Sequence, residues 1–275
     1  MVCCGGWVSA AESGARITVL DGQAALVVGA RSLQAVEGLR VADGTLLSTD
    51  ARCQLLRIEW PDGTLLDLGP ASLLMLAPPA ALGSAAGFYL LRGWAKFSSP
   101  EARRGWLMPA LAGRPAKGVV VLMASEAVSR GFAETGSQAL VERSSGKPLA
   151  LAAGELLSLA PGRAAELVPR LSSAVATQLP RAFRDSLPPR LPALTAVLAA
   201  AGREPVAAAG TALTYTELQP WLQAEAPVRQ DFPRRFASLL AAPEFRAAVT
   251  ANLRHHPEWA AALQAQRPRQ PGASR

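Results

Sequence analysis

Hydrophobic and polar residues alternate most regularly over residues 53–68. Apolar side chains occupy every second position on two short arms, at Leu56, Ile58, Trp60, Leu66 and Leu68. The positions between them are charged, at Arg57, Glu59 and Asp67. Alternation with a period of two gives a strand one buried face and one solvated face. The pattern therefore predicts a β-hairpin whose charged residues face water.

The turn of this hairpin fits a three-residue loop of Pro61, Asp62 and Gly63. A two-residue loop of Asp62 and Gly63 would place Pro61 at a paired position that needs an N–H, which proline lacks. In the longer loop, Pro61 takes the second position of a type I turn and Gly63 takes the left-handed bulge position. The apolar residues then share one face, with the pairs Trp60–Thr64, Ile58–Leu66 and Leu56–Leu68.

Short apolar segments separated by glycine-containing turns continue through residues 15–162. Three of the turns read Asp-Gly, a dipeptide typical of tight hairpins. The spacing of the segments is irregular, which argues against a strict repeat protein. We therefore expect a mainly β domain over residues 15–162, built as a β-sandwich or a rolled β-solenoid.

Prolines interrupt residues 163–213, which we interpret as a linker with a short helix near 193–201. Residues 214–263 have helical periodicity, and Thr214 with Glu217 matches a capping box. The polar, proline-containing residues 264–275 are expected to be disordered. The chain thus reads as a β domain followed by a small α-helical region.

One apolar stripe of this helical region has residues four positions apart, which places them on one helix face. Its members are Val228, Phe232, Phe236 and Leu240. We take Phe232 and Phe236 as candidates for docking a partner protein.

The net charge is +7, and arginine supplies nearly all of the positive charge. Residues 1–160 hold 14 basic and 13 acidic side chains, whereas residues 161–275 hold 14 and 8. A basic half can contact nucleic acid, anionic lipid or acidic glycan. Because no dense basic run or basic–aromatic interleaving is present, we favour an ordinary arginine-rich surface and expect no nucleic-acid partner.

Residues 1–14 carry an apolar stretch, and Val8-Ser9-Ala10 resembles a signal-peptide cleavage site. No basic segment precedes it, so these residues read either as part of a truncated signal peptide, which we favour, or as a disordered end. Residues 68–91 carry no charge and are long enough to cross a bilayer. Prolines and glycines interrupt them, so two strands are expected there and no transmembrane helix.

No nucleotide-binding, hydrolase or metalloprotease motif occurs in the chain. Three cysteines, two of them adjacent at the N-terminus, exclude an internal disulfide framework. His255 and His256 are the only histidines, so no metal site or cofactor is expected. Cys53 begins a strand, and no nucleophile–base pair is evident near it. We expect no catalytic residues and a protein that is not an enzyme.

Trp106 is the best tryptophan for a surface role, because it follows Arg103 and Arg104 in a loop rich in glycine and proline. Exposed tryptophan suits sugar rings or a partner protein, and arginine adds charge recognition. Trp106, Arg103 and Arg104 are therefore the candidate ligand-binding residues.

Residues 15–162 resemble the FecR-like domain of bacterial envelope proteins. The resemblance rests on an ordered set of motifs: Gly38–Thr49, Asp62–Leu68, Phe88–Gly93, Val120–Phe132 and Gly154–Gly162. The chain departs from the family pattern at Ala124-Ser125 and Arg130–Phe132, where Thr-Pro and Gly-Thr elements are usual. The signalling members carry an anti-sigma segment and a membrane helix before this domain. We expect neither in this sequence, so a sigma-regulator role is not carried over.

The resemblance implies a β scaffold in the periplasm or cell envelope, with no catalytic residues. We expect an exported, non-enzymatic envelope protein that acts as a protein-interaction or scaffold module. The alternative is a module that binds glycan or peptidoglycan. A hydrolase with an unusual site is the weakest of the three hypotheses.

Overall fold

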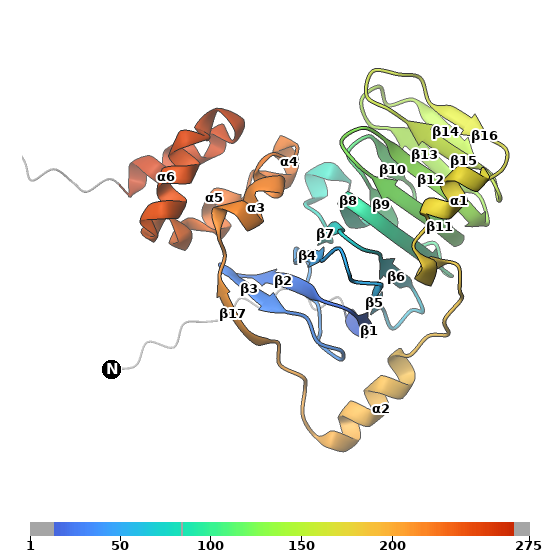
Figure 1. The fold of residues 1–275 in the computed structure, drawn as a ribbon, viewed down its shortest axis with the longest axis horizontal. Coiled ribbons are helices and arrows are strands. Elements are labelled where there is room, and N and C mark those ends of the chain that lie inside the picture. The colour runs from blue at the N-terminus through green and yellow to red at the C-terminus, as the bar shows by residue number, and fades with distance from the viewer. Residues whose placement is uncertain (1–13, 84, 267–275) are drawn as a thin grey trace, which may run out of the picture. The chain divides into compact units, whose positions relative to one another are not determined.

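The computed structural model describes residues 14–83 and 85–266, which form two compact units (Figure 1). The first unit comprises the residues up to Leu26 together with Leu33–Ala209. The second comprises Val27–Ser32 and the residues from Gly210 onward. The prediction of a mainly β protein with C-terminal helices is confirmed. The predicted leader lies almost entirely outside the described residues, as does most of the predicted C-terminal tail.

The strands are short, apart from β8. They are β1 (Arg16–Asp21), β2 (Ala24–Val28), β3 (Arg31–Gln34), β4 (Leu46–Thr49), β5 (Leu55–Glu59), β6 (Leu65–Leu68), β7 (Leu73–Leu76), β8 (Ala86–Ser99), β9 (Gly105–Leu107), β10 (Leu111–Gly113), β11 (Gly118–Ala124), β12 (Ser129–Thr135), β13 (Gln138–Glu142), β14 (Pro148–Leu151), β15 (Leu156–Leu159), β16 (Glu166–Val168) and β17 (Ala208–Ala212).

The helices lie in the C-terminal part of the chain, except for the short 3-10 turn η1, and β17 lies between α2 and α3. The α-helices are α1 (Ser173–Gln178), α2 (Leu191–Ala201), α3 (Tyr215–Leu222), α4 (Ala226–Arg229), α5 (Phe232–Arg235), α6 (Pro243–Ala251) and α7 (Ala260–Ala265). The 3-10 turns are η1 (Ala80–Leu82), η2 (Arg181–Phe183), η3 (Ala237–Ala241), η4 (Leu253–His255) and η5 (Pro257–Trp259).

The strands of the first unit form two layers that share β8. The C-terminal part of β8 pairs with β6 and β11 in a layer that also contains β1, β5, β12, β15 and β16. Its N-terminal part pairs with β7 and β9 in the other layer, where the β8–β9 pair is parallel. Gly93 lies between the two parts with φ of 94°, and a Cβ there would come within 2.4 Å of Ser72 Cα. Only glycine fits this close backbone approach.

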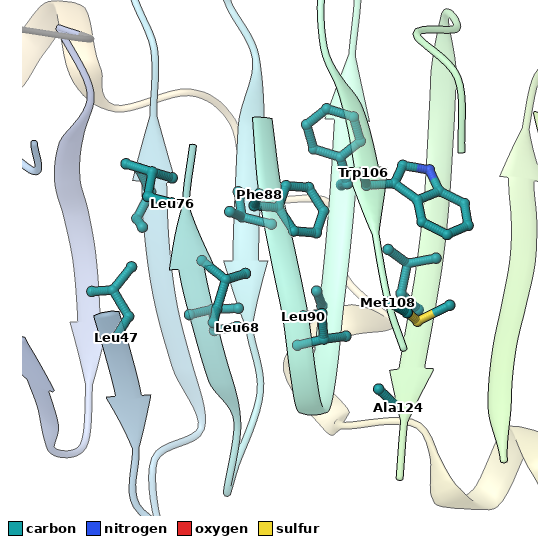
Figure 2. Packing of buried hydrophobic residues seen from close by; sticks show 14 of the residues in the cluster. Leu47, Leu68, Leu76, Phe88, Leu90, Trp106, Met108 and Ala124 are labelled. Atoms are coloured by element: carbon teal, nitrogen blue, oxygen red, sulfur yellow. The ribbon is translucent and has the colours of Figure 1, made fainter. Parts of the chain in front are cut away.

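The core lies between these layers and takes its side chains from both (Figure 2). Ile58, Leu66 and Leu68 enter it from one layer, whereas Leu90 and Trp106 enter it from the other. Phe88 meets Phe97 edge to face, with ring centroids 5.2 Å apart. The alternation in the sequence thus places one side of each strand in a shared apolar interior.

The β5–β6 hairpin has the predicted register. Leu56 pairs with Leu68 and Ile58 with Leu66. The Trp60 amide donates to the Thr64 carbonyl at 3.0 Å, which closes the three-residue loop. Gly63 has φ of 80°, as the bulge position requires.

The expectation that the charged residues of this hairpin face water is wrong. Arg57, Glu59 and Asp67 are only 3%, 1% and 4% exposed. Arg57 and Asp67 are cross-strand partners and form a bidentate ion pair, with N–O distances of 2.6 and 2.7 Å. Glu59 accepts a hydrogen bond from the Thr18 hydroxyl at 2.7 Å. The second face of the hairpin is therefore polar but buried.

Residues 179–191, here called the strap, cover this polar face. Lys96 donates to the Phe183 carbonyl at 2.8 Å, and Arg57 donates to the Leu187 carbonyl at 2.9 Å. The Glu59 carboxylate accepts the Arg190 amide at 2.9 and 3.0 Å. The region expected to be a linker thus has its middle part fixed to the β-sheet by charged side chains.

Other parts of residues 163–213 are also structured. Strand β16 pairs with β15, so the β structure extends past the expected limit at residue 162. The helix expected near residues 193–201 is present as α2, and Gly202 ends it in the left-handed conformation. Glu204, two residues after Gly202, accepts hydrogen bonds from Arg16, which lower the pKa of Glu204 to about 2.

The second unit begins at Gly210 and also includes the tip of the β2–β3 hairpin, which no sequence pattern indicated. The Leu213 amide donates to the Ala30 carbonyl at 3.1 Å. The predicted capping box is confirmed at α3, where the Thr214 side chain and the Glu217 side chain each accept the other's backbone N–H. Helix α7 includes residues 264 and 265, which were expected to be disordered.

Candidate functional site

A pocket of about 300 Å³ opens beside the turn of the β5–β6 hairpin. Trp60 and Asp43 line it together with residues 76–77, 85–87 and 103–104. It therefore includes both arginines that the sequence indicated as ligand-binding candidates. The site brings together five segments of the chain between residues 43 and 104.

Arg104 is held in place on three sides. Its guanidinium forms an ion pair with Asp62 in the hairpin turn and lies 5.0 Å from the centre of the Trp60 ring. Its side chain runs over Gly87, where a Cβ would come within 2.9 Å of Arg104 Cδ. Charge pairing and cation–π contact both favour this single position of the guanidinium.

The hairpin turn holds the Asp62 carboxylate in position for this ion pair. The Thr64 amide donates to the Asp62 carboxylate at 3.0 Å, as in an Asx turn. Burial alone would raise the pKa of Asp62, but hydrogen bonds from Arg104 and Thr64 outweigh it and lower this pKa. Asp62 is thus an anchor for Arg104 and is ionised at neutral pH.

Arg103 differs from Arg104, because its side chain is exposed at the edge of the pocket. Within residues 14–83 and 85–266, no acidic side chain forms an ion pair with it. The preceding residue, Ala102, has φ of 50°, and Ala77 in the pocket wall has φ of 42°. These left-handed conformations cost about 1 kcal/mol or more for a residue with a Cβ, and they set the course of both segments at the pocket.

The prediction that Trp106 is a surface residue is wrong. Trp106 is 1% exposed, because its indole lies over Gly113 on the neighbouring strand β10. A Cβ at residue 113 would come within 2.1 Å of the Trp106 ring, so the missing side chain makes room for it. Figure 2 shows Trp106 among the core residues. Of the three candidates, Arg103 and Arg104 lie at the pocket and Trp106 packs inside the domain.

The structure also contradicts an exposed docking stripe at Phe232 and Phe236. They are 2% and 0% exposed, and their rings meet edge to face at 5.2 Å. Arg235 covers the Phe236 ring at 4.9 Å. The expectation of one helix face is also wrong, because Val228, Phe232 and Leu240 lie on the separate short elements α4, α5 and η3 and Phe236 is the C-cap of α5. All four side chains are buried.

Trp60 and Asp62 were not singled out as site residues from the sequence. Asp62 meets Arg104 across a separation of 42 positions, and no local pattern signals such a contact. The three-residue turn was the one available signal, since it exposes the Asp62 carboxylate beside the strand.

Cys53 is a further titratable group of the first unit. Burial raises the pKa of Cys53, which is a free thiol at the start of the hairpin. In the part of the chain that the structure describes, no group of three or more His, Cys, Asp or Glu side chains could bind a metal ion. Within the same ranges, none of the helices is long and apolar enough to span a bilayer.

His256 is a buried histidine in the second unit. It is 0% exposed, and its Nε2 lies 3.2 Å from the Tyr215 hydroxyl. Burial lowers the pKa of His256; Glu258 opposes this shift, while Arg229 and His255 add to it. The folded state therefore favours the neutral ring.

Acidification is expected to destabilise the second unit. The unfolded chain binds a proton at His256 near pH 6.5, whereas the folded chain binds it only at lower pH. The stabilisation is complete above the unfolded pKa and is lost as the pH falls through about 6.5 towards the folded pKa. Hydrogen exchange of residues 214–262, followed from about pH 8 to about pH 5 and corrected for intrinsic rates, measures this loss. In His256→Gln the dependence should flatten, and an equal loss in both proteins would contradict the assignment.

Comparisons with known proteins show weak structural likeness. No family model and no curated protein matches this chain. Two crystal structures are similar, each of a protein named a putative anti-sigma factor from Parabacteroides distasonis ATCC 8503. The alignment with one of them has 13% sequence identity and a TM-score of 0.38, and it covers 46% of this chain and 59% of the other chain. The alignment with the second has 12% sequence identity and a TM-score of 0.40, and it covers 48% of this chain and 63% of the other chain. The chain thus spans less than two thirds of either structure.

Proposed function

We propose that this chain is a non-enzymatic protein-interaction module of the cell envelope, and that its pocket binds an acidic group of a partner protein. Arg103 supplies a free guanidinium at the edge of the pocket, and Arg104 supplies a second one in a fixed position. A guanidinium recognises a carboxylate through two parallel hydrogen bonds. The observation that carries the proposal is the exposed Arg103 beside the pre-positioned Arg104.

The fixed position of Arg104 favours binding, because little side-chain freedom remains to be lost when a ligand arrives. Asp62 neutralises part of its charge, and Asp43 adds a second carboxylate to the lining. The exposed charge of Arg103, for which residues 14–83 and 85–266 provide no ion-pair partner, therefore decides which ligand charge is favoured. A carboxylate on a partner side chain matches it.

Export and the FecR-like assignment belong to the same proposal. Their support is the apolar stretch with Val8-Ser9-Ala10 and the ordered glycine and Asp-Gly motifs of residues 15–162. Cell fractionation of the natural host, with antibody detection of the chain, tests the location. Recovery in the cytosol alone would contradict the envelope assignment.

A glycan-binding module is the second candidate, favoured by the arginines of the pocket and the basic C-terminal half. Sugar rings usually stack on exposed aromatic faces. Among the described tryptophans, Trp94 is partly buried, and the rest are buried at Trp60, Trp106, Trp221 and Trp259. The pocket therefore supplies charge recognition without a free aromatic platform, which favours the protein partner.

Arg103→Ala is expected to weaken partner binding by about tenfold or more, in line with loss of a charge-assisted hydrogen-bonded contact. The wild-type chain, Arg103→Ala and the control Arg163→Ala, which removes another exposed arginine, would be compared by retention of envelope proteins. Polyglutamate should compete with wild-type binding. Equal retention by all three chains would contradict the proposal, whereas Arg103-dependent sedimentation with purified sacculi alone would favour the glycan.

A further inference from the structure

The strap contributes no residue to the pocket lining. Its polar contacts with the sheet are all of one kind. Every hydrogen bond that Lys96, Arg57 and Glu59 make with the strap reaches a main-chain atom: the two cations donate to carbonyls, and the Glu59 carboxylate accepts from amides. These contacts recognise main-chain atoms at the end of the η2 turn, in the loop that follows it and at the start of α2, and they make few demands on side chains. A surface that binds main chain in this way can accept more than one sequence.

The strap contributes one deeply buried side chain. Phe183 is 3% exposed and packs against Leu55 and Val121 on the same outer side of the sheet. Residues 184–190 are exposed. Pro188 and Pro189 fix φ at their own positions, favour an extended backbone at the residue before each of them, and lower the entropy lost on docking. The strap is therefore a surface-bound peptide with one aromatic anchor.

The surface beneath the strap can be uncovered at low cost. Beyond the small apolar cluster around Phe183, it presents the charged groups of Arg57, Glu59 and Lys96, which water solvates well. No strand ladder ties residues 179–191 to the sheet. Segments with few buried apolar contacts open without global unfolding.

We propose that the outer face of β5, β6 and β8 is a chain-binding groove that the strap occupies in the resting protein, and that a segment of a partner protein with the backbone course of the strap takes its place. The strap defines the pattern such a segment needs. An aromatic side chain fills the position of Phe183, a carbonyl four residues later accepts from Arg57, and amides seven and eight residues later donate to Glu59. This groove is a second interaction surface and does not depend on the pocket.

The test uses a labelled peptide of residues 178–192 as the probe and the full chain as the receptor. In an opened variant, residues 183–190 are replaced by glycine and serine at the same length. We expect this variant to bind the peptide about tenfold or more tightly than the wild type, whose own strap competes. Phe183→Ala in the peptide, or Lys96→Ala in the opened variant, should each weaken binding about tenfold. A folded opened variant that does not bind the peptide would overturn the proposal.

Hydrogen exchange of the wild-type chain gives a second test that does not depend on any variant folding. The Arg190 and Leu191 amides are protected by Glu59 and report strap opening directly. We expect them to exchange about tenfold or more faster than the amides of β5 and β8. Exchange of these two amides at the rate of the core strands would show that the strap leaves only on global unfolding, and would overturn the proposal.

Discussion

Asp67→Ala is expected to destabilise the first unit by roughly 3–5 kcal/mol, the usual cost of removing one partner of a buried ion pair. Asp67 accepts two hydrogen bonds from Arg57, and the two side chains are only 4% and 6% exposed. Without Asp67, the guanidinium keeps only the carbonyls of the strap as partners. Denaturant unfolding, with the midpoint and slope fitted together, measures the change in free energy.

Two further variants sharpen this experiment. Glu134→Ala removes a more exposed carboxylate that pairs with Lys96 on the same sheet, and should cost about 0–1 kcal/mol. Arg57→Met combined with Asp67→Leu removes both charges, and should recover most of the loss because no buried charge is left unpaired. A change below about 1 kcal/mol for Asp67→Ala would show that water reaches Arg57 and that the strap does not seal the polar face.

Trp106→Ala should destabilise the first unit by roughly 3–5 kcal/mol, as expected for truncating a buried tryptophan. The indole fills the space over Gly113 between the two layers. Trp106→Phe retains much of that volume and should cost less. Equilibrium unfolding in guanidinium chloride measures both variants.

This experiment also separates the two roles considered for Trp106. Arg103→Ala, three residues away, removes an exposed side chain and should change stability by less than about 0.5 kcal/mol. A surface role for Trp106 would give the opposite result, with stability unchanged and ligand binding lost. Binding and unfolding measured on the same preparations therefore distinguish a core residue from a ligand-binding residue.

The β5–β6 hairpin shows which structural features the local sequence can predict. Its register follows from alternation and from the chemistry of Pro61 and Gly63, all within a few residues of one another. The same alternation predicts that Arg57 and Asp67 face water. That prediction fails because the strap, about 120 residues further along the chain, covers them. Period-two alternation separates polar from apolar faces, but it does not show whether a polar face is solvated.

For the candidate site too, the local sequence indicated some of the residues but not their environment. Arg103 and Arg104 were identified from the local sequence, because two arginines precede a tryptophan in a loop rich in glycine and proline. The role of Trp106 was assigned wrongly, because its burial depends on Gly113 and on the pairing of β9 with β10. The contact between Arg104 and Asp62 joins two loops, and only the folded chain brings them together.

The sequence by itself determined the mainly β class, the hairpin register, the α3 capping box and the apolar character of Phe232 and Phe236. These features depend on turn geometry, side-chain periodicity and hydrogen bonds between near neighbours. Only the tertiary structure decided that Phe232 and Phe236 are buried, that Trp106 is core and that the proline-rich segment is a strap over buried charges. Each of these outcomes depends on which distant surface covers a given face, and that is set by packing of the whole chain.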